Sequence, residues 1–143
     1  MSTEENKALV RRWIDGHNRH DPAIVDELIA DDYVYHRPDG QDIKGPKMLK
    51  ELFIAFRPVF PDIHYTIDDM VAEGDKVAVC YTSTATHKGE YMGIAPTGKR
   101  VTMKSAFFYR FKGGKMVEAV SYSDSLAMFR QLGVAPPMEQ SGG

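Results

Sequence analysis

Asp124 is the residue of this chain best placed to do chemistry, because it stands where a strand-like segment gives way to a helix-like one. Residues 115–123 alternate as a half-buried strand does, and apolar residues recur at helical spacing from Leu126. Val120 and Tyr122 share its side of that alternation, and apolar neighbours there would raise its pKa and make it a usable general base. The segment alone favours a helix N-cap, because Asp is a common capping residue.

The preceding strand supplies further residues for the same face. Gly113-Gly114 predicts a two-residue hairpin that joins residues 99–111 to residues 115–123. Pairing Lys112 with Lys115 then fixes which side chains face each other. One face gathers Met103, Ser105, Phe107, Val120, Tyr122 and Asp124. An apolar wall with two hydroxyls and one carboxylate is typical of a small-molecule pocket, although its apolar members could equally be core.

Helix-like segments precede these strands. A capping box, Ser2-x-x-Glu5, opens the first helix, Asp21-Pro22 opens a second, and Gly45-Pro46 opens a third that ends before Pro58. Short strand 33–36 separates the second helix from the third, and long strands with period two follow residue 62. This order predicts an α+β fold with helices on one face of an antiparallel sheet. Such long strands must curl, so we expect a cone that encloses one apolar pocket.

Composition limits the classes of function. The 143 residues suit a single domain, which we place at residues 1–134 with a flexible tail at 135–143. A net charge of −2 without a basic cluster argues against nucleic acid, and no apolar run is long enough to span a membrane. The polar N-terminus lacks a signal core, and the lone Cys80 favours a reducing compartment, so we expect a cytoplasmic protein.

The five histidines do not predict a metal site, because no pair has the spacing of zinc ligands. His17 falls on the buried stripe of the first helix, where a core histidine is the common outcome. His36 ends the first short strand and could donate to a substrate oxygen or make a structural hydrogen bond. His87 precedes the Gly-rich loop 89–98, and its expected role is to position that loop.

Five motifs cover nearly the whole chain from about Glu5 to Gly133: GHNRHDPAIVDELIADDYVYHRP, FPDIHYTIDDMVAEGDKVAV, THKGEYMGIAPTGKRV, YRFKGGKMVEAV and DSLAMFRQLG. Together they resemble the SnoaL-like polyketide cyclase family, whose members are often called ester cyclases. That family belongs to the nuclear transport factor 2-like superfamily, with ketosteroid isomerase and scytalone dehydratase. The block THKGEYMGIAPTGK is the most specific of these motifs.

The resemblance implies a cone-shaped barrel with the active site inside and a homodimer packed through the outer sheet face. The cyclases close a ring by intramolecular aldol condensation, with no metal or cofactor. An aspartate at the end of the last strand acts as general acid/base, and Asp124 matches it, so motif and register together favour catalysis over the cap. The cyclases pair that aspartate with a histidine on the neighbouring strand, and residues 99–111 contain none.

The remaining pocket candidates follow from the superfamily, in which the first helix borders the pocket mouth. Trp13, His17, Tyr33 and Phe56 are therefore candidates for substrate binding, with a core role as the alternative for each. Small residues on the expected outer face suit a homodimer contact: Thr82, Thr84, Ala106, Ala119 and Ser121. Two functions stay open: a cofactor-independent enzyme that acts on an apolar or aromatic carbonyl or ester compound, and a non-catalytic protein that binds an apolar ligand.

Overall fold

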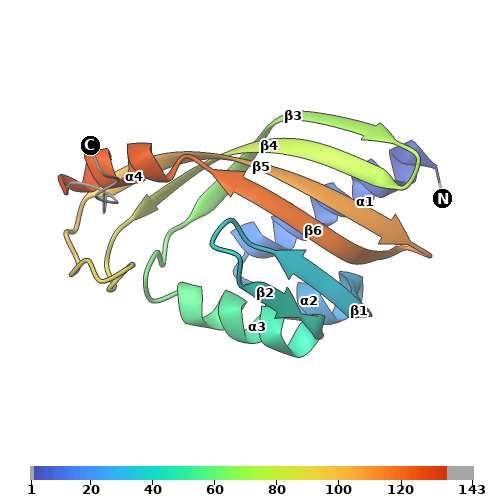
Figure 1. Cartoon of the computed structure of the whole chain (residues 1–143), viewed down its shortest axis with the longest axis horizontal. Coiled ribbons are helices and arrows are strands. Elements are labelled where there is room, and N and C mark those ends of the chain that lie inside the picture. Colours follow the sequence, from blue (N-terminus) through green and yellow to red (C-terminus); the bar gives the residue numbers. More distant parts are fainter. Residues whose placement is uncertain (1, 135–143) are drawn as a thin grey trace, which may run out of the picture.

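The computed structural model describes residues 2–134, which form four helices and six strands (Figure 1). The helices are α1 (Thr3–Asn18), α2 (Ala23–Leu28), α3 (Gly45–Phe56) and α4 (Ser125–Leu132). The strands are β1 (Ile29–His36), β2 (Asp42–Lys44), β3 (His64–Glu73), β4 (Lys76–Thr86), β5 (Arg100–Lys112) and β6 (Lys115–Ser123). The elements follow the order expected from the sequence, with β2 as an addition. The tail expected at 135–143 lies outside the described residues.

All six strands form one curved sheet in the order β2-β1-β6-β5-β4-β3. Strands β3 to β6 are antiparallel neighbours, as their hairpins require. Strand β1, however, pairs parallel with β6, so the expectation of an entirely antiparallel sheet is corrected to a mixed one. Hairpins fix the direction only of strands that are consecutive in sequence, and β1 is separated from β6 by most of the chain. The α+β class itself is confirmed.

The helices cover the concave face of the sheet, where Figure 1 shows α1, α2 and α3 gathered beneath the long strands. Ser2 and Glu5 form the capping box of α1, and the helix packs its apolar stripe against β3 and β4. Helix α3 begins at Gly45-Pro46 and packs against β1. No helix among residues 2–134 is long and apolar enough to span a membrane.

A β-bulge at Val117 decides which side chains of β6 face the helices. Phe111 pairs with Met116 as expected, but Arg110 then pairs with Glu118, so Val117 has no partner on β5. From Glu118 onward, every residue of β6 is therefore shifted by one relative to the regular hairpin. Ala119 and Ser121 are buried on the inner face, whereas Tyr122 is 61% exposed. The expected faces of β6 are thus reversed after the bulge.

Candidate functional site

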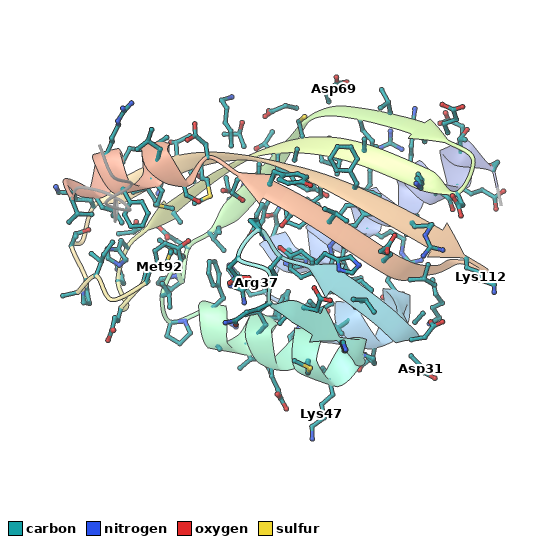
Figure 2. The ribbon with its side chains drawn as sticks, viewed as in Figure 1. Asp31, Arg37, Lys47, Asp69, Met92 and Lys112 are labelled. Atoms are coloured by element: carbon teal, nitrogen blue, oxygen red, sulfur yellow. The ribbon has the colours of Figure 1, made fainter. Side chains whose placement is uncertain are left out.

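A cavity of about 520 Å³ lies between the concave sheet face and helices α1 and α3. This volume is in the range of small-molecule sites. Most of its lining is aromatic: Trp13, Tyr33, Tyr35, Phe53, Phe56, Phe60, Tyr65, Tyr81, Tyr91, Phe107 and Tyr109. Figure 2 labels two residues of the cavity lining, Arg37 just after β1 and Met92 on the loop between β4 and β5.

Seven of the eleven predicted site residues line this cavity: Trp13, His17, Tyr33, Phe56, Met103, Ser105 and Phe107. The four that do not are His36, Val120, Tyr122 and Asp124. The bulge accounts for Val120 and Tyr122, because it turns both side chains toward the outer face, where Val120 pairs with Phe108 and Tyr122 with Ala106. Their predicted place in the pocket wall is wrong, whereas Ser121 and Ser123 of the same strand line the cavity instead.

Asp124 is exposed and acts as the N-cap of α4. Its Oδ1 accepts a hydrogen bond from the backbone N–H of Ala127 at 3.0 Å. The residues on either side, Ser123 and Ser125, line the cavity, but Asp124 does not. The expected place of its carboxylate among Met103, Phe107 and Val120 is therefore wrong. The burial on which the predicted general base depended is absent.

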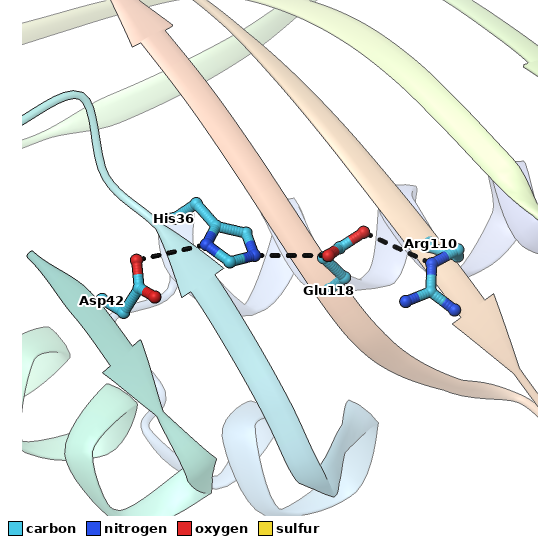
Figure 3. Close-up of polar contacts among 4 residues, drawn as sticks. All are labelled: His36, Asp42, Arg110 and Glu118. Atoms are coloured by element: carbon cyan, nitrogen blue, oxygen red, sulfur yellow. Dashed lines mark hydrogen bonds and ion pairs between the residues drawn. The ribbon is translucent and has the colours of Figure 1, made fainter. Parts of the chain in front are cut away.

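His36 lies on the outer face of the sheet in a chain of polar contacts across four strands (Figure 3). Its Nδ1 lies 3.1 Å from Asp42 of β2, and its Nε2 lies 3.2 Å from Glu118 of β6. Glu118 also accepts a hydrogen bond from Arg110 of β5 at 3.3 Å. Although partial burial acts to raise it, hydrogen bonds from Arg110 and His36 hold the pKa of Glu118 below its usual range. The predicted pocket role of His36 is replaced by a structural one.

Two pairs of hydroxyl groups lie within the cavity lining. The Tyr81 and Tyr109 hydroxyls are 3.1 Å apart, and the Tyr35 hydroxyl lies 2.6 Å from Ser121 Oγ. Burial raises the pKa of Tyr81, Tyr109 and Tyr35 above the ordinary value for tyrosine. All three hydroxyls are therefore protonated at neutral pH and can donate hydrogen bonds.

Each pair has one donor to spare. A hydroxyl carries a single hydrogen, so within a pair one group donates to the other, and the acceptor's own hydrogen stays free. Tyr65, which also lines the cavity, has a pKa raised by burial to about 12 and is likewise protonated. The cavity thus presents O–H donors on an apolar wall, an arrangement suited to binding a carbonyl oxygen or stabilising an enolate.

His17 reaches the cavity from α1 and is packed among aromatic rings. Its ring centroid lies 4.5 Å from that of Trp13, 4.7 Å from that of Phe53 and 5.9 Å from that of Tyr65. Burial, with a smaller contribution from nearby His20, lowers its pKa to about 3, so the ring is neutral at physiological pH. Its Nε2 is buried and has no hydrogen-bond partner among the described residues.

Charged side chains line the cavity only at Arg37, Asp39 and Arg57 within residues 2–134. Arg37 and Asp39 pair with each other at 3.1 Å, and the Arg37 and Asp39 side chains are 33% and 46% exposed. The solvent therefore reaches this end. Asp39 is the one carboxylate of the described residues that lines the cavity, and besides burial its charge contributes to the raised pKa of Tyr35.

The loop between β4 and β5 closes another side of the cavity through Tyr91 and Met92. His87 is buried beneath this loop and accepts a hydrogen bond at Nδ1 from the backbone N–H of Thr97 at 3.2 Å. The predicted role of His87 in positioning the loop is confirmed. No group of three or more His, Cys, Asp or Glu side chains among residues 2–134 is arranged to hold a metal ion.

Reasoning from sequence missed the hydroxyl groups of Tyr81, Tyr109 and Ser121. The signal for the first two was present, since Tyr81 alternates with Val79 and Ser83 in β4, and Tyr109 alternates with Phe107 in β5. Ser121 could be found only by recognising the bulge. Glu118 gave a hint, because a regular hairpin would have placed its carboxylate on the same inner face as Val120.

Comparison with known proteins supports the family resemblance that the sequence motifs indicate. A family model described as SnoaL-like polyketide cyclase matches residues 7–132. AclR from Streptomyces galilaeus, provisionally described as a hydroxylase, is 31% identical, with a TM-score of 0.84 over 97% of this chain and 91% of its own. IdmH from Streptomyces antibioticus, provisionally described as a polyketide cyclase, is 30% identical, with a TM-score of 0.80 over 90% of this chain and 99% of its own. A search of curated proteins finds no match.

A third structure, from Catenulispora acidiphila and described as having a ketosteroid isomerase-like fold, is 18% identical. It aligns with a TM-score of 0.76 over 88% of this chain and 92% of its own, and it supports the fold alone. The family match covers most of the residues that build the sheet, the helices and the cavity, from α1 to the end of α4. The chain belongs to the SnoaL-like polyketide cyclase family.

Proposed function

We propose that the protein is a cofactor-independent cyclase or isomerase that enolises an apolar carbonyl compound bound in the cavity. The observation that carries this proposal is the Tyr81–Tyr109 pair. One hydroxyl hydrogen of this pair has no acceptor within the pair and can donate to the carbonyl oxygen of a ligand. Family membership alone does not fix the reaction, because relatives at 31% and 30% identity are described as a hydroxylase and a cyclase.

The proposed step begins when a base removes a proton from the carbon next to the carbonyl group. The C–H electrons form a C–C double bond, and the carbonyl electrons move to oxygen, which becomes an enolate. The free hydroxyl hydrogen of the Tyr81–Tyr109 pair donates to that oxygen in an aromatic cavity. In an isomerase the proton is then returned to a different carbon atom of the conjugated enolate. In a cyclase it attacks a second carbonyl, and the new alkoxide takes the proton.

The base of this step is proposed to be Asp124, the position that matches the family aspartate, in a conformation where its carboxylate leaves the cap. Ser123 and Ser125 on either side line the cavity, so the backbone of Asp124 already lies at its edge. Asp124→Asn removes the base while keeping a side chain that can cap α4. Unchanged turnover in this variant would end the proposal for Asp124 and leave the rest of the site in place.

A binding protein without catalytic activity is the second candidate, and one observation favours it. The one carboxylate of the described residues that lines the cavity, Asp39, is paired with Arg37 at 3.1 Å, so the bound carbonyl compound would meet donors without a free base. The two candidates differ in a measurable way, since only the enzyme exchanges the α-protons of a bound ketone.

The test uses 2-tetralone, an apolar ketone with exchangeable α-protons, in D2O at neutral pH. We expect the wild-type protein to accelerate loss of the α-proton NMR signals above the buffer rate. The double variant Tyr81→Phe/Tyr109→Phe, which removes both hydroxyls of the pair, should reduce that acceleration by about 10²-fold, the usual effect of losing an oxyanion donor. Binding of 2-tetralone without accelerated exchange would overturn the enzyme and support the binding protein. An unchanged rate in the double variant would remove the tyrosine pair from the mechanism.

We also propose a homodimer through the outer sheet face. Phe108 and Tyr122 are 48% and 61% exposed there, and their rings are 6.4 Å apart in a T-shaped arrangement. Thr82, Thr84 and Ala106 lie on this face as expected, whereas Ala119 and Ser121 are buried inside, contrary to expectation. Exposed aromatic rings of this kind mark contact sites. Light scattering should give a dimer at micromolar concentration that Tyr122→Lys dissociates; a monomeric wild type would contradict this.

The cytoplasmic location stays a prediction.

A further inference from the structure

We propose that His17 is a polar anchor for the ligand, and that the protein gives up folding stability to keep this imidazole unpaired in the cavity wall. The inference rests on the proposed function only in taking the cavity as the ligand site. It concerns binding, so it holds or fails independently of whether any proton is removed from the ligand.

The first observation is that the surroundings of His17 are apolar. Trp13, Phe53 and Tyr65 surround the imidazole with ring centroids 4.5, 4.7 and 5.9 Å away. A phenylalanine or leucine would suit such a box better, because a buried polar group without a partner lowers stability. A buried histidine normally donates one ring N–H and accepts at the other nitrogen, whereas Nε2 of His17 has no partner among the described residues.

The second observation is that His17 borders the cavity rather than closed core. An unsatisfied polar group that lines an apolar cavity can be satisfied by a ligand, and destabilising groups of this kind are typical of functional sites. Val10, a fully buried residue of the same helix that does not line the cavity, is an ordinary apolar core side chain.

The chemistry of the ring indicates what it recognises. Burial lowers the pKa of His17 to about 3, so the ring carries no charge that would attract an anion. A neutral imidazole suits an uncharged hydroxyl or carbonyl group. The aromatic neighbours suit a flat apolar body next to that group. We therefore infer that His17 selects a planar ligand with an uncharged hydrogen-bonding group at the edge that meets α1.

A matched pair of probes tests this inference. In 2-naphthol and 2-methylnaphthalene a hydroxyl replaces a methyl group on the same planar body. Trp13 is the single tryptophan of the chain and touches His17, so its fluorescence reports binding beside the ring. Dissociation constants are measured for both probes with wild type, His17→Phe, His17→Leu and a control, His64→Phe, which replaces an exposed histidine of β3.

We expect wild type to prefer 2-naphthol by about fivefold to tenfold, the range that one hydrogen bond supports. The preference should fall below about twofold in both His17 variants and persist in His64→Phe. A preference that survives both His17 substitutions, or is absent in wild type, would overturn the inference.

Two further measurements separate recognition from packing. Thermal unfolding should show a Tm several degrees higher for at least one of the two His17 variants, because the unpaired nitrogen is gone. In wild type labelled with ¹⁵N-histidine, a ring resonance of His17 should shift on adding 2-naphthol and stay in place on adding 2-methylnaphthalene. A lower Tm in both variants would show that His17 supports the fold, and an unshifted resonance would show that it does not contact the hydroxyl. Either result contradicts the proposal.

Discussion

The two faces of the sheet are built from the same strands, but their polar groups differ in burial and charge. On the inner face, hydroxyls and one neutral imidazole are held uncharged by burial, as the raised tyrosine pKa values and the lowered His17 pKa indicate. On the outer face, Asp42, His36, Glu118 and Arg110 form a chain of polar contacts (Figure 3), in which hydrogen bonds from Arg110 and His36 lower the pKa of Glu118. The side of the sheet on which a residue lies therefore decides whether its polar group is buried and neutral or partly exposed and paired with other charged groups.

One residue in β6 separates these outcomes. Because side chains alternate along a strand, a single extra residue exchanges the inner and outer sets. The bulge at Val117 sends Ser121 inward to pair with Tyr35 and sends Glu118 outward to pair with Arg110 and His36. A regular hairpin would have turned the Glu118 carboxylate toward the inner face and left the outer face without this polar chain.

A one-residue deletion in β6 after the bulge should give the largest effect. Deleting Ala119 reverses every later position of β6, so Tyr122 enters the interior and Ser121 leaves Tyr35. We expect a loss of at least about 3 kcal/mol in the free energy of unfolding, because bulky groups enter a packed core. Urea denaturation followed by circular dichroism measures it.

The matched control deletes Val117 instead. Glu118 would then follow Met116 directly and still pair with Arg110, so both faces keep their residues. We expect this variant to fold and to lose less than about 2 kcal/mol, since only the half-buried bulge residue is lost. Equal destabilisation by the two deletions would contradict the view that the bulge sets the faces.

The same feature explains how far the sequence predicts this molecule. The capping box of α1, the Gly45-Pro46 start of α3 and the Gly113-Gly114 turn depend on local chemistry, so each was predicted correctly. Residues of β5 that line the cavity were also predicted, because Met103, Ser105 and Phe107 lie on the strand before the turn. Val117 has no side-chain signature that distinguishes a bulge from regular strand, so the β6 half of the site was placed on the wrong face.

Acid titration should sharpen the contrast between the faces. His17 has a pKa of about 3 when folded and an ordinary value of 6.5. Below pH 6.5 the unfolded chain binds a proton that the folded protein does not, so stability is lost as pH falls from 6.5 toward 3. The slope from this one group is about 1.4 kcal/mol per pH unit.

Comparing variants separates the contribution of His17 to the pH dependence of stability from the contribution of the carboxylates, which also titrate in acid. The stability of His17→Phe minus that of wild type should grow as pH is lowered from 7 to 4, by about 1.4 kcal/mol per unit below the unfolded value. His64→Phe, which replaces an exposed histidine of β3, is the control for losing one histidine. Urea unfolding at several pH values measures both, and a constant difference for His17→Phe would contradict its neutral state.

Asp124, which follows β6 and caps the N-terminus of α4, should contribute to stability through this cap. Asp124→Ala removes the acceptor for the Ala127 N–H and should cost about 1 kcal/mol. Asp124→Ser keeps a capping oxygen and should lie within a few tenths of a kcal/mol of wild type. Thermal and urea unfolding give both values. Equal stability of the Ala and Ser variants would show that the cap contributes nothing.

The smallest expected effect belongs to the outer chain. Glu118 accepts from Arg110 and faces His36, and these groups are between 35% and 42% exposed. Because the solvent screens such pairs, Glu118→Gln should cost less than about 1 kcal/mol near neutral pH, and added salt should reduce the difference. The pKa of Glu118 is lowered in the folded protein, so its contribution is present above the unfolded value and disappears as pH falls through the folded one.

Glu90→Gln is the matched control, since Glu90 lies exposed in the loop and forms no ion pair with the described residues. We expect no salt-dependent change in its stability. If Glu118→Gln instead costs several kcal/mol and the cost persists at high salt, the outer chain is as protected from solvent as the interior. The distinction between a charged, screened outer face and a neutral, buried inner face would then fail at the residue that the bulge moved between them.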